Sequence, residues 1–155
     1  MGGAAQVWSL DGDKHALDLV QQHYEINPDI PRDQPHILQK SDMFDWLNQA
    51  RDKNQRFDLI IADPPSFASS QAQIPTAQKA YGRLFSAAAN LLNPGGQILC
   101  CSCSSHIGHD KFQEIVQKNL LHKTRQAQDF SGLPPDHVAT FAEAKYLKAW
   151  LITVK

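Results

Sequence analysis

Hydrophobic residues follow two different spacings that alternate along the chain. Short apolar runs typical of strands lie at residues 6–10, 36–39, 58–62, 96–101 and 146–154, with a weaker candidate at 123–129. The stretches between them place apolar residues three or four positions apart, as helices do, and these include Leu17, Leu47, Leu84 and Ile115. Strands that alternate with helices predict an α/β fold with a mostly parallel, doubly wound sheet and right-handed crossovers.

Residues with known end-capping preferences set the expected helix limits. Asp13 is placed to cap the first helix, which should stop before Asn27 because proline at 28 disfavours a helical neighbour. Ser41 or Asp42 should cap the second helix. The third helix should begin near residue 75, include Leu92 on its apolar stripe and stop at residues 93–96, Asn-Pro-Gly-Gly.

Two of the expected strands end in residues that can do chemistry. The run at 58–62 is nearly all apolar, which predicts a central strand covered by helices on both faces, and it leads into Asp63-Pro64-Pro65-Ser66-Phe67. The run at 96–101 leads into Ser102-Cys103-Ser104. Because ligands of open parallel sheets collect outside the carboxyl ends of strands, we expect a catalytic crevice there.

Size, charge and cysteine content narrow the class of protein. A chain of 155 residues, 42% hydrophobic, is predicted to form a single domain over residues 1–155. Its formal net charge of −1 neither favours nor excludes nucleic acid. We expect a cytoplasmic protein without a membrane partner, because no apolar stretch approaches the roughly 20 residues of a membrane span and the three cysteines are clustered rather than spread as a disulfide framework.

Several short motifs, in this order, resemble one enzyme family. They are Gly2-Gly3-Ala4 before Asp11, Ser41-Asp42-Met43-Phe44, Asp63-Pro64-Pro65-Ser66-Phe67, Ser102-Cys103-Ser104 and Tyr146-Leu147-Lys148. The chain resembles class I S-adenosylmethionine-dependent methyltransferases, and it looks most like the catalytic domain of the bacterial large-subunit ribosomal RNA cytosine-C5 methyltransferases. The resemblance implies a Rossmann-like methyltransferase fold, S-adenosylmethionine as cofactor and RNA, from the large ribosomal subunit, as substrate.

The resemblance breaks at the front of the chain. In the family a first strand and a glycine-rich turn precede the segment that matches Gly2-Gly3-Ala4, so the fold is expected to be N-terminally truncated. That strand would lie between the strands at 6–10 and 58–62. We therefore expect either direct pairing of these two strands or self-association through the gap, because an unpaired strand edge invites pairing.

The resemblance also implies a set of cofactor residues. Asp11 would accept both ribose hydroxyls, although an aspartate there also suits the start of a helix. Asp42 would accept from the adenine amine while Met43 or Phe44 covers the ring, and Asp42 is equally a good helix cap. Asp63 and Pro64 would border the cofactor on a loop that its prolines stiffen.

Cys103 and Asp63 are the predicted catalytic residues. A thiolate that adds to C6 of cytosine makes C5 nucleophilic enough to accept a methyl group, and a carboxylate near N3 favours the adduct. Pro65 and Phe67 would contact the substrate, Phe67 by stacking on a base. We expect Asp63 and Cys103 to open onto one crevice, roughly 10 Å apart or less. Strand alternation puts Cys101 and Cys103 on one face, with Cys100 opposite.

Other interpretations remain open. Cys103 can equally be a buried small residue, Asp63 part of a structural turn and Phe67 part of the core. Asp63-Pro64-Pro65 also suits a methyltransferase that modifies an exocyclic amine, and a non-catalytic relic of the fold is a third reading. We expect no metal site, because two thiols about 7 Å apart along a strand and histidines at 106 and 109 fit a zinc ion poorly.

Overall fold

The computed structural model describes residues 3–29, 34–132 and 146–155. Gly2, which belongs to one of the motifs above, lies outside this range. The chain divides into two compact units, 1–49 and 50–155, and each is described by itself.

The N-terminal unit is a βαβ arrangement in which two parallel strands flank one helix. Strand β1 (Val7–Asp11) leads into α1 (Lys14–Ile26), and β2 (His36–Lys40) pairs with β1 in a register that places Asp11 opposite Lys40. The Asp13 carboxylate accepts a hydrogen bond from the His15 amide at 2.9 Å, which confirms it as the cap of α1. Helix α1 stops before Asn27, as expected.

Helix α2 (Met43–Asp52) follows β2 and runs across the boundary between the units. Oδ1 of Asp42 accepts hydrogen bonds from the amides of Phe44 at 2.8 Å and Asp45 at 3.1 Å. These two bonds satisfy backbone donors at the start of the helix, so Asp42 is its cap.

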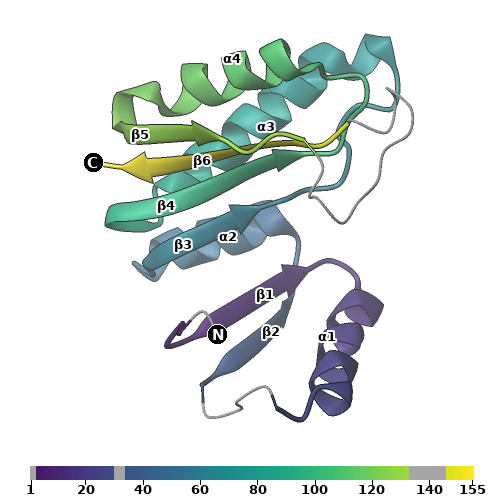
Figure 1. Ribbon diagram of the computed structural model, residues 1–155, viewed down its shortest axis with the longest axis vertical. Coiled ribbons are helices and arrows are strands. Elements are labelled where there is room, and N and C mark those ends of the chain that lie inside the picture. Colours follow the sequence, from purple (N-terminus) through teal and green to yellow (C-terminus); the bar gives the residue numbers. More distant parts are fainter. Residues whose placement is uncertain (1–2, 30–33, 133–145) are drawn as a thin grey trace. The chain divides into compact units, whose positions relative to one another are not determined.

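The C-terminal unit is a four-stranded sheet with the strand order β3-β4-β6-β5 (Figure 1). Strands β3 and β4 are parallel, whereas β6 runs antiparallel to both β4 and β5. The elements in chain order are β3 (Phe57–Ala62), η1 (Gln71–Gln73), α3 (Ile74–Ala89), β4 (Leu92–Ser102), α4 (His109–Leu120), η2 (Leu121–Lys123), β5 (Thr124–Asp129) and β6 (Lys148–Val154). The weak strand expected at 123–129 is thus confirmed as β5.

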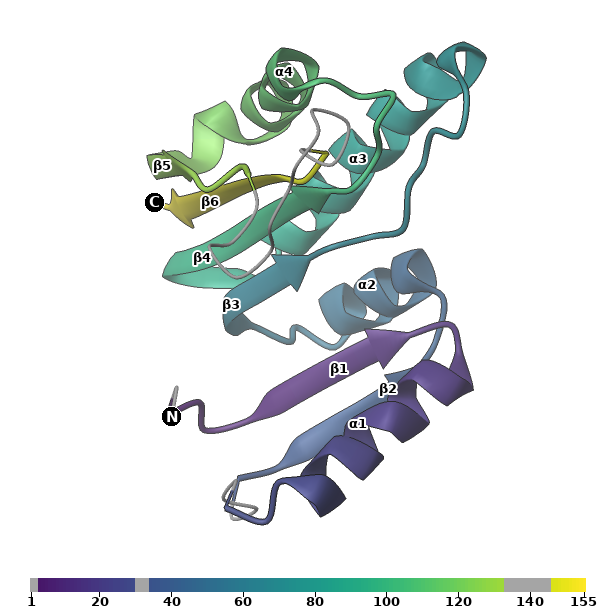
Figure 2. The same ribbon diagram turned by 45° about the vertical axis from the view of Figure 1, so that its right-hand side comes forward.

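Helices α3 and α4 pack against each other on one face of this sheet (Figure 2). The rings of Tyr81, Phe85 and Phe112 fill their interface, with centroids 5.7 to 5.9 Å apart and the three side chains fully buried. Edge-to-face packing of Phe112 against both other rings adds a specific geometry to their burial.

The expected end of the third helix is wrong by several residues. Helix α3 ends at Ala89, and Leu92, which the helical stripe had included, is the first residue of β4 and pairs with Phe57. The Phe57 amide donates to the Leu91 carbonyl at 2.9 Å, so pairing with β3 begins there. Residues 93–96 lie at a break in register between the Phe57–Leu92 and Leu59–Gln97 pairs, and Gly95 there takes a positive φ of 78°. Asn-Pro-Gly-Gly therefore forms an irregularity within β4 instead of ending the helix.

The expectation that β3 is covered on both faces is also wrong. Leu59 and Ile61 are 54% and 64% exposed, while Ala62 is buried. Side chains alternate along a strand, so Leu59 and Ile61 share the face opposite Ala62. In the described residues, β3 is an edge strand of the four-stranded sheet and one of its faces remains exposed to solvent.

The predicted direct pairing of the strands at 6–10 and 58–62 is contradicted. In the described part of the chain β1 pairs with β2, β3 pairs with β4, and the two pairs belong to different sheets. A membrane-crossing helix would need greater length and more apolar character than any helix has within the described ranges.

Candidate active site

The carboxyl ends of β3 and β4 bring the two predicted catalytic segments side by side. These strands are parallel neighbours, with Ala62 opposite Cys100, so the residues that follow them leave the sheet at the same end. Asp63 comes directly after β3 and is exposed, while Pro64 behind it is buried. A buried proline with a fixed φ holds the chain where the carboxylate meets solvent.

The three cysteines differ sharply in their surroundings. Cys100 and Cys101 are buried in β4, whereas Cys103 is partly exposed and lies just beyond the last residue of that strand. Burial raises the pKa of Cys100 well above its ordinary value. Burial, helped by the charge of Asp63, raises the pKa of Cys101 to about 11. Cys103 is therefore the one accessible thiol of the three, as the nucleophile assignment requires.

Cys103 stands between two buried serines that are anchored by hydrogen bonds. Ser102 and Ser104 are 0% and 1% exposed, and the Ser104 amide donates to the Ser102 hydroxyl at 3.3 Å. The Ser104 hydroxyl donates to the Ala68 carbonyl at 3.0 Å, which ties this segment to the loop after β3. Anchors on both sides fix the backbone that carries Cys103.

Tyr81 of α3 links the two halves of the site. Its hydroxyl lies 2.9 Å from the Ser102 hydroxyl, and the backbone of Phe67 also hydrogen-bonds to it. Burial raises the pKa of Tyr81, these hydrogen bonds oppose the change, and the charges of Cys103 and Asp63 add to it. Both Cys103 and Asp63 thus lie within electrostatic reach of one phenol.

Phe67 is held by packing rather than left free. Its side chain is partly buried, and its ring centroid lies 4.7 Å from that of Tyr81 at an interplanar angle of 59°. The exposed Pro65 precedes it in the loop. This contact favours a structural role for Phe67, and stacking of a base on its remaining exposed edge stays a prediction.

The predicted cofactor residues of the N-terminal unit gather at one end of its strand pair. The Ser41 amide donates to the Asp11 carbonyl at 3.1 Å, which joins the segments that follow β1 and β2. Asp11 is exposed, and its Oδ1 accepts from the Asp13 amide at 2.8 Å. Met43 is partly buried beside the cap of α2. Binding of the ribose by Asp11 and of the adenine beside Met43 stays a prediction.

Sequence reasoning missed the polar residues that support Cys103. The spacing of Tyr81 predicted a core residue on α3, and its buried ring confirms this. Its hydroxyl contact with Ser102 joins positions 21 residues apart, which no local pattern indicates. Lys148 was part of a family motif without an assigned role, and it is buried beside this segment, with its ammonium donating to the Ser104 carbonyl.

His109, one of the two histidines considered as metal ligands, has a carboxylate partner. The imidazole Nε2 of His109 lies 2.7 Å from Asp129 Oδ2, which joins α4 to β5. No group of three or more histidine, cysteine, aspartate or glutamate side chains within the described ranges is arranged to hold a metal ion.

Solved structures define the class of protein to which this fold belongs. A methyltransferase crystallised with SAH matches 99% of this chain and 40% of its own with a TM-score of 0.78 and 26% identity. A methyltransferase from Streptococcus mutans, described as SAM-dependent, gives a TM-score of 0.79 at 27% identity with the same coverage. Parallel strands ending in an acid and a loop, together with these matches, define a Rossmann-like methyltransferase fold.

Residues 1–149 match the model of the S-adenosylmethionine-dependent methyltransferase family, so the chain belongs to that family. The cofactor of this family is S-adenosylmethionine.

Curated relatives are methyltransferases named for ribosomal RNA. A ribosomal RNA large subunit methyltransferase of Deinococcus radiodurans is 37% identical over 150 residues, which make up 96% of this chain and 36% of the relative. Ribosomal RNA large subunit methyltransferase I of Klebsiella pneumoniae is 35% identical over 159 aligned residues, 99% of this chain and 39% of the relative. The chain thus spans somewhat more than a third of these relatives' length.

Proposed function

We propose that this chain carries the catalytic residues of an RNA methyltransferase that transfers a methyl group from S-adenosylmethionine to C5 of a cytosine in large-subunit ribosomal RNA. The names of the curated relatives support ribosomal RNA as the class of substrate. The accessibility of Cys103 supports the C5 chemistry, because a methyl transfer to an amine needs no thiol.

The observation that carries the proposal is the contrast between Cys103 and its two neighbours. Cys100 and Cys101 are buried and their pKa values are raised, so neither supplies a thiolate near neutral pH. Cys103 lies at the strand end, partly exposed, next to the segment that carries Asp63. A flipped base entering between these two segments would meet a thiol on one side and a carboxylate on the other.

The mechanism follows from these positions. The Cys103 thiolate adds to C6, the C5–C6 π electrons form a C4–C5 double bond, and N3 takes up a proton from solvent beside the Asp63 carboxylate. This leaves C5 nucleophilic, as in an enamine. Bound S-adenosylmethionine supplies an electrophilic methyl group on its sulfonium. After the transfer, the C5 proton leaves to a solvent base, the S–C6 bond breaks and the Cys103 thiolate departs, which restores the C5–C6 double bond. N3 then returns its proton to solvent, which leaves neutral 5-methylcytosine.

The proposed cofactor contacts are assigned residue by residue. In the N-terminal unit Asp11 would accept from the ribose hydroxyls and Asp42 from the adenine amine, with Met43 against the ring. In the C-terminal unit Asp63 and Pro64 would border its methionine end. The capping bonds of Asp42 occupy Oδ1, so both functions can be served by one carboxylate.

Nucleoside analysis of methylated RNA tests the reaction class. The chain is incubated with a large-subunit ribosomal RNA transcript and labelled S-adenosylmethionine, and the RNA is digested and analysed by mass spectrometry. The proposal predicts 5-methylcytidine, lost in Cys103→Ala and retained in the matched control Cys101→Ala.

A methyltransferase that modifies an exocyclic amine is the second candidate, because Asp63 is exposed on a proline-stiffened loop. It predicts an N-methylated nucleoside and activity that survives Cys103→Ala. A chain that yields no methylated RNA and no heat of binding with S-adenosylhomocysteine in calorimetry would be the non-catalytic relic of the fold.

A further inference from the structure

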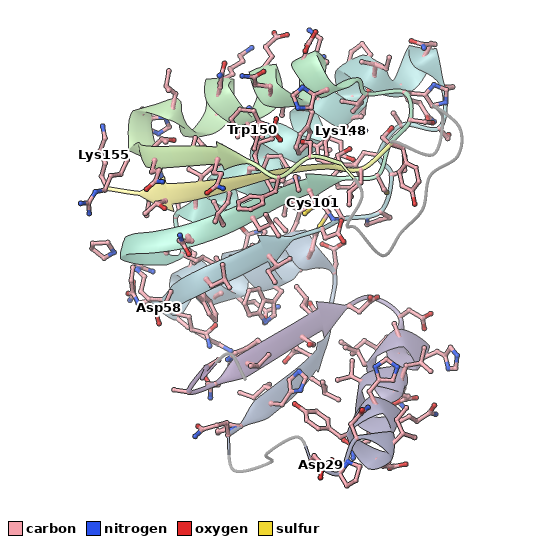
Figure 3. The ribbon with its side chains drawn as sticks, in the orientation of Figure 1. Asp29, Asp58, Cys101, Lys148, Trp150 and Lys155 are labelled. Atoms are coloured by element: carbon pink, nitrogen blue, oxygen red, sulfur yellow. The ribbon has the colours of Figure 1, made fainter. Side chains whose placement is uncertain are left out.

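Lys148 is buried at the point where β4 ends and β6 begins. Only 5% of the residue is exposed, and it is the one buried lysine in the described part of the chain. The register of the antiparallel pair places Lys148 opposite Ser102, one residue before Cys103. Figure 3 labels Lys148 and Cys101 at this same end of the sheet.

The Lys148 ammonium is tied to the segment that carries Cys103. Its Nζ donates to the Ser104 carbonyl at 2.5 Å, and Ser104 directly follows the cysteine. This bond, together with the contacts of Ser102 and Ser104 described above, fixes the backbone on both sides of Cys103. A flexible lysine held in this way loses side-chain entropy, so a compensating interaction is needed.

A buried ammonium is costly unless a negative charge lies near it. None of the ion pairs within the described ranges includes Lys148. Burial lowers the pKa of Lys148, and the charge of Cys103 opposes that change. In the described residues Cys103 is the group whose negative charge acts on Lys148, so a thiolate there would supply the partner that the buried ammonium lacks.

We propose that Lys148 is a positioning residue, whose buried ammonium holds the Ser104 carbonyl and stabilises Cys103 as a thiolate. When Cys103 ionises, its proton leaves to solvent, and Lys148 remains protonated before and after the thiolate attacks. The role of the thiolate as nucleophile rests on the proposed function, whereas the lysine–thiolate pair itself does not.

Other titratable groups near this pair contribute to its electrostatic environment. They are Tyr81 of α3, Asp63 after β3 and Cys101 of β4. The negative charge of Asp63 would disfavour a second negative charge nearby, so a cation is needed more here than at an isolated thiol.

Alkylation of Cys103 by iodoacetamide as a function of pH tests the pair without cofactor or RNA. Lys148→Met keeps the length and apolar stem of the side chain but removes the charge, and Lys148→Arg keeps the charge. In Lys148→Met we expect alkylation at pH 7.5 to be about tenfold slower and the midpoint of the rate profile to rise by about one pH unit. Lys148→Arg should recover most of the rate. Identical profiles in wild type and folded Lys148→Met would overturn the proposal.

A reciprocal measurement keeps the test decisive if Lys148→Met does not fold. The titration of Lys148 is followed by NMR of ¹³C-labelled lysine in wild type and in Cys103→Ala. Removing the thiolate should lower the titration midpoint of Lys148, and an unchanged midpoint contradicts the pair.

The two proposals fail in different ways. Formation of 5-methylcytidine by the wild type, together with unchanged alkylation in Lys148→Met, would refute only the pair. A clear effect of Lys148 on alkylation without any 5-methylcytidine would refute the C5 reaction and leave the pair standing.

Discussion

The hydroxyl groups of Tyr81 and Ser102 lie 2.9 Å apart inside the four-stranded unit, and both side chains are fully buried. This contact joins α3 to the last residue of β4, immediately before Cys103. It therefore couples the packing of the aromatic core to the position of the proposed nucleophile.

Removing the Tyr81 hydroxyl should destabilise the fold. Tyr81→Phe keeps the ring packed but leaves the buried Ser102 hydroxyl short of a partner, which costs about 1–2 kcal/mol in the free energy of unfolding. Urea denaturation followed by circular dichroism measures the change. Tyr146→Phe, at a tyrosine that is 40% exposed, is the control and should change stability little. A Tyr81→Phe protein as stable as wild type would show that the contact contributes nothing.

The three thiols should react in a fixed order. With a pKa of about 11, Cys101 is ionised in about one molecule in a thousand at pH 8, and burial of Cys100 acts in the same direction. Iodoacetamide at pH 8 should modify Cys103 alone in the native protein, and all three residues in urea. Tandem mass spectrometry of the labelled peptide locates the modification. Labelling of Cys101 at the rate of Cys103 would refute the assignment of one accessible thiol.

Asp11 is predicted to contribute to cofactor affinity. If binding of S-adenosylhomocysteine is measurable in calorimetry, Asp11→Ala should weaken it by roughly 1.5–3 kcal/mol, because a charge-assisted hydrogen bond to the ribose is lost. Asp13→Ala removes the cap of α1 next to it and serves as the control, which should lower stability with a smaller effect on affinity. Equal affinity in wild type and Asp11→Ala would refute a role of Asp11 in cofactor binding. Its carboxylate would then serve only to accept the hydrogen bond from the Asp13 amide.

The exposed face of β3 predicts self-association of the isolated chain. Leu59 and Ile61 present apolar side chains on an edge strand, a feature that favours pairing with another chain. Sedimentation velocity should reveal concentration-dependent dimers or larger species, reduced by Ile61→Lys. Leu121→Lys, at a leucine that is 68% exposed outside the sheet, should leave the association unchanged. A wild-type chain that remains monomeric at all concentrations would contradict this prediction.

The type of each helix and strand could be predicted from the sequence, because the spacing of apolar residues and the capping residues determine it. Asp13 and Asp42 cap helices where their side chains suggested it, and the strand pair that carries Asp63 and Cys103 is parallel and adjacent as expected. The two caps depend on spacing within one turn of chain, whereas the parallel pairing follows from the alternation of strands and helices along the chain. Local sequence therefore specifies the helix limits, and the order of the elements specifies which strands are parallel.

The errors have a common physical origin in contacts between distant residues. Leu92 has helical spacing but joins β4, because pairing with Phe57 decides its conformation. Leu59 and Ile61 have the composition of a covered strand, yet their coverage depends on neighbours that an apolar run cannot reveal. The hydroxyl pair of Tyr81 and Ser102 and the burial of Lys148 likewise depend on the assembled sheet.

Covalent trapping on RNA that contains 5-fluorocytidine tests the central claim most directly. Fluorine at C5 cannot leave as a proton does, so a thiolate that has added to C6 stays attached after the methyl transfer. With S-adenosylmethionine present, we predict a protein–RNA adduct that survives denaturation, maps to Cys103, and is absent in Cys103→Ala but present in Cys101→Ala. A wild-type chain that methylates unmodified cytidine yet forms no adduct with the fluorinated RNA would contradict Cys103 as the nucleophile.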